Sequence, residues 1–203
     1  MAKDVKIVLF AAILVFSVIV PVAAANELIV VNFDDLDYGW TLSGTTYAGL
    51  TWEWGNEIDG HLGEWCIPIE DGPGSYPYSE PHVAINGWGA SLMGIGFPEE
   101  VDVLGAYFAG AGTHFTPGVR VHGYLGETEL ATTDWFNDIN ETPDWFAINL
   151  NNVDRIVIES IPIERQDLPD YSWYGMDDLT YVPEPATFLL LGLGGLLLRK
   201  RRR

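Results

Sequence analysis

Hydrophobic and polar positions alternate in many short runs between residues 26 and 182. The runs are rich in β-branched and aromatic residues, and Gly, Pro, Asn and Asp separate them, as in short strands joined by turns. Outside the two ends of the chain, no stretch has the length and period of a helix. We therefore predict strands at residues 28–33, 47–54, 82–85, 91–97, 101–108, 119–125, 128–132, 145–150, 155–161 and 173–181.

This series predicts an all-β fold, a single antiparallel β-sandwich of jelly-roll type over residues 26–182. The alternation is clear at residues 119–125, where Val119 and Val121 share one face of a strand. Arg120, His122 and Tyr124 fall on the opposite face. We interpret that face as a solvated surface, although the trio has groups that can bind a ligand.

The first 25 residues have the three parts of a secretory signal peptide. Lys3 and Lys6 precede an almost uninterrupted apolar run of 14 residues at 7–20, in which Ser17 is the one polar residue, and small residues end the segment at Ala25. A run of 14 is shorter than the roughly 20 residues that cross a bilayer. We predict a signal helix that directs the chain to the secretion machinery and is removed by signal peptidase after Ala25.

The C-terminal 21 residues, 183–203, have a different three-part pattern. Pro183, Glu184 and Pro185 come first, residues 188–198 are apolar or Gly, and residues 199–203 are all basic. Eleven residues make a helix of about 16 Å, roughly half of a hydrocarbon core. We expect a short hydrophobic helix that is a processing signal rather than a permanent anchor, with its basic end in the cytoplasm.

This order of motif, apolar span and basic tail resembles the PEP-CTERM sorting signal. The resemblance implies an exported protein of a Gram-negative-type bacterium that an exosortase-type enzyme processes near the Pro-Glu-Pro motif. It also implies transient attachment to the inner membrane through the C-terminal span. The final location would be the cell surface or the extracellular matrix, and exopolysaccharide would be a partner.

The net charge of the central region excludes one class of function. Only three residues between 26 and 182 are basic and 27 are acidic, a net charge of −24. Such a surface repels phosphate backbones, so nucleic-acid binding is excluded. Cys66 is the only cysteine of the chain, so no intrachain disulfide stabilises this exported domain.

A pair of acidic motifs makes calcium a candidate cofactor. Asp34 and Asp35 follow the first predicted strand, and Asp177 lies in the last one, on the same side as Leu179 and Tyr181 by strand alternation. Pairing of the first and last strands would bring these hard oxygen ligands together. The last strand resembles the closing strand of galactose-binding-like jelly rolls, which implies a structural calcium there. In the alternative interpretation, Asp177 accepts hydrogen bonds from backbone N–H groups.

Eight tryptophans offer candidate contacts for sugar rings. We select Trp52 and Trp54, which alternate onto one strand face, and Trp88 in a Gly-rich stretch. The alternative is that the indoles fill the core, where Trp buries much area.

Catalytic signals are weak. Glu57 and Asp59 offer two carboxylates for a polysaccharide hydrolase, but the segment between Gly55 and Gly60 has the composition of a loop, and no further partner carboxylate has the expected spacing.

We therefore predict a non-catalytic surface or matrix protein that binds carbohydrate and calcium. The alternatives are a hydrolase that uses Glu57 and Asp59, and a purely structural surface protein.

Overall fold

The computed structural model describes residues 27–68, 77–112, 115–163 and 171–184, and the two predicted terminal helices lie outside these ranges. The described residues contain no helix, which confirms the all-β prediction. Their strands are β1 (Ile29–Val31), β2 (Thr46–Tyr47), β3 (Leu50–Trp52), β4 (Glu57–Ile58), β5 (His61–Leu62), β6 (Glu64–Cys66), β7 (Ala84–Gly87), β8 (Leu92–Gly110), β9 (Gly118–Leu125), β10 (Thr128–Thr132), β11 (Phe136–Asn137), β12 (Asp144–Ser160) and β13 (Tyr174–Pro183).

Among the described residues, 11 strands form one antiparallel sheet with the central order β10–β9–β12–β8–β13–β7–β6. β1 pairs with the end of β13, β3 pairs with the start of β8, β2 pairs with β3, and β11 pairs with β9. The small hairpin β4–β5 stands apart from this sheet. The predicted pairing of the first and last strands is therefore confirmed, with Val31 opposite Leu179.

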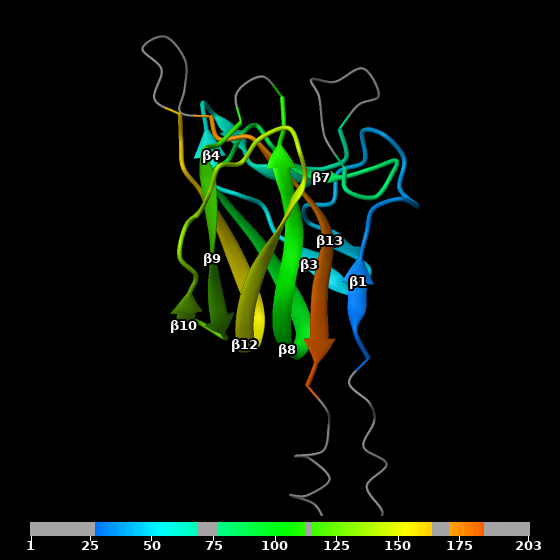
Figure 1. The fold of residues 1–203 in the computed structure, drawn as a ribbon, viewed down its shortest axis with the longest axis vertical. Helices are drawn as coiled ribbons and strands as arrows, with labels where there is room; N and C mark the ends of the chain where they lie inside the picture. The colour runs from blue at the N-terminus through cyan, green and yellow to red at the C-terminus, as the bar shows by residue number, and fades with distance from the viewer. Residues whose placement is uncertain (1–26, 69–76, 113–114, 164–170, 185–203) are drawn as a thin grey trace, which may run out of the picture. The chain divides into compact units, whose positions relative to one another are not determined.

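The long strands β8 and β12 bend together and fold the sheet into two layers (Figure 1). Their pairing shifts register three times between Ala147 and Arg155, opposite the bend of β8 near Pro98. Asn149 and Asn152 have positive φ angles of 52° and 56° there, a conformation that Asn tolerates better than most residues. Strands that change layer through such bulges make the corner of a sandwich.

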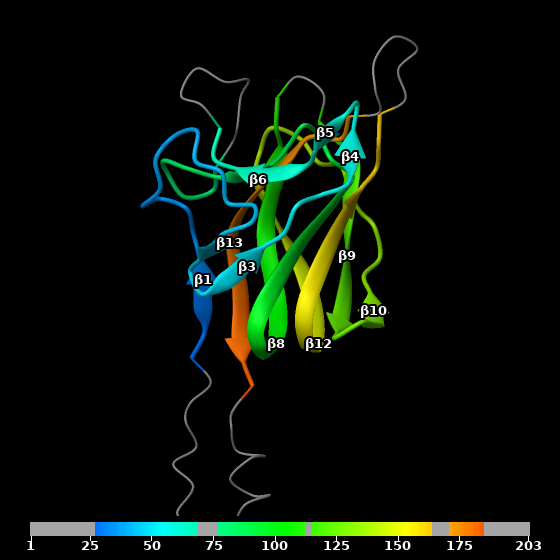
Figure 2. The same ribbon diagram turned by 180° about the vertical axis from the view of Figure 1, so that it is seen from behind.

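We call the two layers sheet A and sheet B. Sheet A contains β3, residues 92–97 of β8, residues 155–160 of β12, β9 and β10, and it is the nearer layer in Figure 2. Sheet B contains the other halves of β8 and β12 with β13, β1, β7 and β6.

This geometry corrects two of the strand boundaries. The strands predicted at 91–97 and 101–108 are the two halves of β8, and those predicted at 145–150 and 155–161 are the two halves of β12. The turn expected at Asn151 and Asn152 is a bulged bend within β12. Because β8 and β12 stay paired with each other through the bend, neither strand reverses its direction there.

The core lies between the two sheets and contains most of the large apolar side chains. Trp52 and Trp65 are fully buried, with ring centroids 5.6 Å apart in an edge-to-face arrangement. Each indole N–H has an acceptor: Trp52 Nε1 donates to the Tyr47 carbonyl at 3.2 Å and Trp65 Nε1 to the Gly94 carbonyl at 3.0 Å. Buried indoles with satisfied N–H groups are strongly stabilising.

We expect Trp52→Ala to lower the free energy of unfolding by about 3–5 kcal/mol, because it leaves a large cavity. Trp40→Ala is the control, since Trp40 is 51% exposed and should lose less than about 0.5 kcal/mol. Urea unfolding followed by Trp fluorescence and circular dichroism measures both. Equal losses in the two variants would contradict the assignment of Trp52 to the core.

Candidate functional site

An open cleft of about 500 Å³ lies on the outer face of sheet A. We call it the outer cleft. Its lining side chains come from the end of β3 and from β8, β9 and β12, the strands nearer the viewer in Figure 2. The polar and aromatic members of the lining are Glu53, Trp54, Asn56, His122, Tyr124, Arg155 and Glu159.

A bidentate ion pair crosses the floor of the outer cleft. Arg155 Nη2 donates to Glu53 Oε2 at 2.7 Å, and Arg155 Nε donates to Glu53 Oε1 at 2.8 Å. The Glu53 side chain lies across Gly94 of β8, where a Cβ atom would collide with its carboxylate. Gly94 thus allows the pair to span a strand. The Arg155 guanidinium also lies over the Tyr124 ring, 5.2 Å from its centroid.

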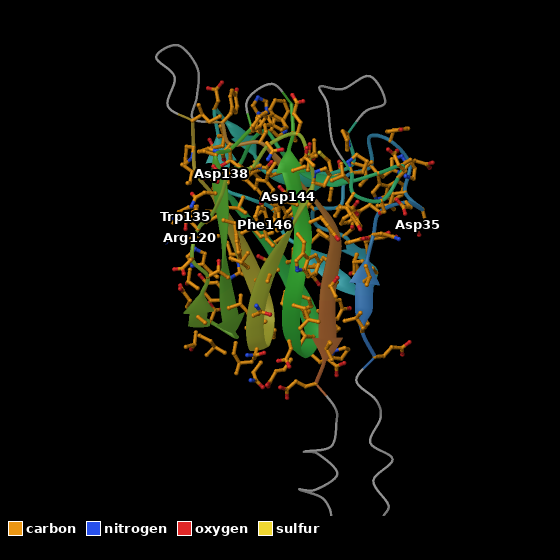
Figure 3. The ribbon with its side chains drawn as sticks, viewed as in Figure 1. Asp35, Arg120, Trp135, Asp138, Asp144 and Phe146 are labelled. Carbon is orange, nitrogen blue, oxygen red and sulfur yellow. The ribbon has the colours of Figure 1, made fainter. Side chains whose placement is uncertain are left out.

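A second polar network continues along the same face. Glu159 Oε2 accepts hydrogen bonds from Arg120 Nε at 2.6 Å and contacts His122 Nε2 at 2.8 Å. His122 Nδ1 lies 3.3 Å from Glu129 Oε1, so the imidazole bridges two carboxylates. Arg120 also stacks on the Trp135 ring at 4.6 Å, and Figure 3 shows the two side chains together at the β9 edge.

The pairing keeps the carboxyl groups of this network ionised. Burial raises the pKa of Glu159, but hydrogen bonds from Arg120 and His122 outweigh it and the net shift is downward. Hydrogen bonds from Thr132 and His122 lower the pKa of Glu129. The charged side chains of the outer cleft are therefore paired with groups of opposite charge, although the domain as a whole is strongly acidic.

The three predicted sugar contacts lie in different environments. Trp52 is buried in the core and offers no ring face to a ligand, which corrects that part of the prediction. Trp54 follows the end of β3, is 50% exposed and lines the outer cleft. Trp88 is 41% exposed and stacks on His61, with the ring centroids 3.9 Å apart. Trp54 separates from Trp52 because the strand ends between them.

Asp177 is buried on the outer side of sheet B, whereas strand alternation predicted that it shares the side of Leu179 and Tyr181. Tyr174 and Met176 face the core before it, and Leu179 and Tyr181 face the core after it, so the alternation changes phase. Asp178 has a φ of 49° at this point, and the pairing with β8 shifts register. This bulge is why simple alternation misassigned the face of Asp177.

Hydrogen-bond donors surround the Asp177 carboxylate. Oδ2 accepts from the backbone N–H groups of Tyr78 and Ser79 at 2.9 and 2.8 Å, and Oδ1 accepts from that of Asp178 at 2.8 Å. Burial raises the pKa of Asp177 to about 6, against the lowering effect of the Ser79 and Asp178 N–H groups. The carboxylate thus ties the segment before β7 to the outer face of sheet B.

The other two predicted calcium ligands lie near the start of the domain. Asp35 accepts a hydrogen bond from the Tyr47 hydroxyl, and Figure 3 places it far from Arg120 and Trp135. Burial raises the pKa of Asp178, and the negative charge of Asp34 raises it further. Within the described ranges, no group of three or more acidic, His or Cys side chains has the geometry to hold a metal ion. Calcium binding stays a prediction.

The candidate catalytic pair lies outside the outer cleft. Glu57 is in β4, and Asp59 is in the turn to β5 with a φ of 51°. The loop expected between Gly55 and Gly60 is therefore a short hairpin. Burial raises the pKa of the Cys66 thiol to about 12, which keeps it protonated and weakly nucleophilic.

Sequence reasoning found part of the outer cleft and missed the rest. It placed His122 and Tyr124 on one outer face but expected only solvent there. It did not identify Glu53, Arg155 and Glu159, whose strands are distant in sequence. One signal was available, because Arg155, Val157 and Glu159 alternate along one face of a predicted strand.

Comparison with known families identifies the C-terminal segment. A family model described as the PEP-CTERM protein-sorting motif matches residues 182–203. No curated protein matches the chain. The motif marks an exported, exosortase-sorted protein that is associated with the membrane before cleavage. Within the described ranges, the structure holds no helix with the length and apolar character needed to cross a membrane.

We expect Asp177→Asn to lower the free energy of unfolding by about 1–3 kcal/mol at pH 7, because at least one backbone N–H loses its acceptor. Asp178→Asn is the matched control and should cost less, since it relieves repulsion from Asp34. Urea unfolding of both variants tests this. A larger loss in Asp178→Asn would contradict the role of Asp177.

The same residue predicts a pH dependence. Its folded pKa of about 6 lies above the ordinary value, so the folded state retains a proton that the unfolded chain loses between pH 4 and 6. The stability that this group contributes therefore declines as the pH rises through that range. The difference in stability between the natural protein and Asp177→Asn should be larger at pH 4.5 than at pH 7. An equal difference at both pH values would refute the shift.

Proposed function

We propose that this exported, exosortase-sorted protein is non-catalytic and binds carbohydrate in the outer cleft. The observation that supports the proposal best is the combination of an exposed indole, Trp54, with the Glu53–Arg155 ion pair in one open cleft. Small-molecule sites combine aromatic surface with a few fixed polar groups. A sugar ring offers an apolar face to the indole and hydroxyl groups to the carboxylate and guanidinium.

The charge of the domain favours a neutral polysaccharide. Both arginines beside the cleft are already paired with carboxylates, Arg155 with Glu53 and Arg120 with Glu159. No net positive charge is then left to attract an anionic polymer, while the acidic domain repels it. Neutral hydroxyl groups, in contrast, can both donate to Glu53 and accept from Arg155.

The electrostatics of the cleft favour binding over hydrolysis. A glycosidase needs a carboxylic acid whose raised pKa keeps it protonated until it donates to the leaving group. Glu159 has the opposite shift, because Arg120 and His122 stabilise its ionised form. The hydrolase that uses Glu57 and Asp59 stays an alternative, and it requires sugar release that Glu57→Gln abolishes.

We expect Trp54→Ala to weaken binding to neutral polysaccharide about tenfold, the equivalent of one aromatic contact of roughly 1–1.5 kcal/mol. Affinity electrophoresis of the purified protein through gels that contain a panel of neutral and uronic-acid polysaccharides measures the retardation. Trp40→Ala is the matched control, since its indole is equally exposed but does not line the cleft.

Four outcomes separate the hypotheses. Retardation by a neutral polymer that Trp54→Ala weakens about tenfold and Trp40→Ala preserves supports the proposal. Retardation that is unchanged in Trp54→Ala places the binding elsewhere and refutes the cleft. No retardation by any polymer, together with no sugar release, favours the purely structural alternative, whereas release that Glu57→Gln abolishes favours the hydrolase.

Calcium stabilisation and the galactose-binding-like jelly roll form the second part of the proposal. Asp34 supports it, because its Oδ1 atom is buried without a hydrogen-bond partner among the described residues and its charge raises the pKa of Asp178, after the larger effect of burial. A cation between two such carboxylates would relieve their repulsion.

We expect calcium at 100 times its Kd to stabilise the protein by about 2.7 kcal/mol, which raises Tm by several degrees. Thermal unfolding with calcium and with chelator measures the shift, and Asp34→Asn should abolish it. Glu127→Gln, in the exposed turn between β9 and β10, is the control for a general charge effect. An unchanged Tm in the natural protein would remove calcium from the proposal.

A further inference from the structure

The two ends of the described domain lie side by side at the same end of sheet B. β1 begins at Ile29, directly opposite Tyr181 near the end of β13. The bend of β8 lies at this end as well, because Pro183 pairs with Val101. Figure 1 shows β1 starting and β13 ending at the lower end of the domain. Ile29 and Pro183 therefore lie at the same end of sheet B.

The sorting motif begins inside this sheet rather than after it. Val182 is opposite Asp102 and Pro183 is opposite Val101 in the ladder between β13 and β8. The backbone N–H of Glu184 donates to the Glu100 carbonyl at 3.0 Å. The first two residues of the Pro-Glu-Pro motif are thus held by β8, and both are half-buried.

Little chain separates this paired end from the apolar segment. Only three residues lie between Glu184 and Phe188, where the apolar run begins. Even when fully extended, the four steps from Glu184 to Phe188 span at most about 14 Å. An enzyme that acts on the motif beside the membrane has this length of chain to work with while β13 stays paired.

Two features of the sequence weaken the pairing at this end of β13. Pro183 has no N–H to donate to the ladder, and Glu99, Glu100, Asp102 and Glu184 bring four acidic side chains to the same corner. Just before this end, Tyr181 and Leu179 are buried in the core. Loss of the pairs at residues 182–184 would therefore stop at Tyr181.

We infer that residues 182–184, the last two residues of β13 and the residue after it, are a strand latch, and that the exosortase-type enzyme engages the Pro-Glu-Pro motif only after this latch has separated from β8. Separation frees residues 182–184 and adds about 10 Å of extended chain to the available length. The folded state of the domain thereby controls how fast the sorting motif is processed.

An engineered disulfide tests this inference with the full chain. Asp102→Cys and Val182→Cys replace register partners, whose Cα atoms in an antiparallel ladder are about 4.5–5.5 Å apart, within the range of a disulfide. The natural Cys66 thiol should not interfere, because it stays protonated. The chain carries an epitope after Arg203 and is expressed in a host with an exosortase-type enzyme that processes the natural chain.

We expect the cross-linked double variant to keep its tail at least tenfold longer than the natural chain, as measured by loss of the epitope. The Val182→Cys single variant controls for the change beside the motif and should be processed normally. Reductant should restore processing of the double variant. A disulfide between the register partners Leu125→Cys and Thr128→Cys, in the β9–β10 hairpin, controls for cross-linking itself.

Equal processing of the cross-linked and single variants would overturn the inference, because the enzyme would then act on the paired motif. Hydrogen exchange provides a readout that does not depend on the enzyme. In the natural protein, the Glu184 amide should exchange more slowly than the exposed Glu127 amide in the β9–β10 turn, yet faster than the amides of the buried core. A fully unprotected Glu184 amide would show that the latch does not form in solution.

Discussion

The continuous pairing of β8 with β12 through their shared bend is the constraint on which the rest of the structure depends. A single ladder supplies the central strands of both sheets, so the layers are joined by hydrogen bonds at one edge as well as by side-chain packing. The bend is tolerated because Asn149 and Asn152 adopt positive φ angles and the register shifts absorb the change of direction. This connection lets a chain without a disulfide hold two sheets around a core that contains Trp52 and Trp65.

The bend also determines where each polar group can lie. In sheet A, it places Arg155 opposite Gly96 and brings the end of β3 alongside, so Glu53 reaches the guanidinium over Gly94. In sheet B, the bulge at Asp178 turns Asp177 outward to accept backbone N–H groups. A carboxylate that faced the core would have had no such donors, and its desolvation would have been far more costly. The bulge thus lets the buried Asp177 carboxylate meet hydrogen-bond donors.

The strands were predictable because alternation and turn residues act locally. The hairpin of β9 and β10 has the predicted boundaries within one residue. The pairing of the first and last strands was expected because these strands pair in many β-sandwiches. The bend was not predictable, since nothing local shows that a strand keeps its partner beyond Pro98. The face of Asp177 depended on one left-handed residue, Asp178, which the sequence pattern could not reveal. The outer cleft was not predictable either, because it forms where segments about 100 residues apart in the sequence meet, as Glu53 and Arg155 do.

The arrangement of the two ends links the fold to export. Successive residues of β8 lead from Leu92, beside the outer cleft, to the bend, beside the latch. The cleft therefore extends away from the end of the domain that carries the sorting motif. Core residues of β13 stop the detachment of the latch at Tyr181, which keeps the cleft intact during processing. Because the strands that form the cleft and the strand that ends in the motif share one ladder, only a folded domain has both a formed cleft and a formed latch.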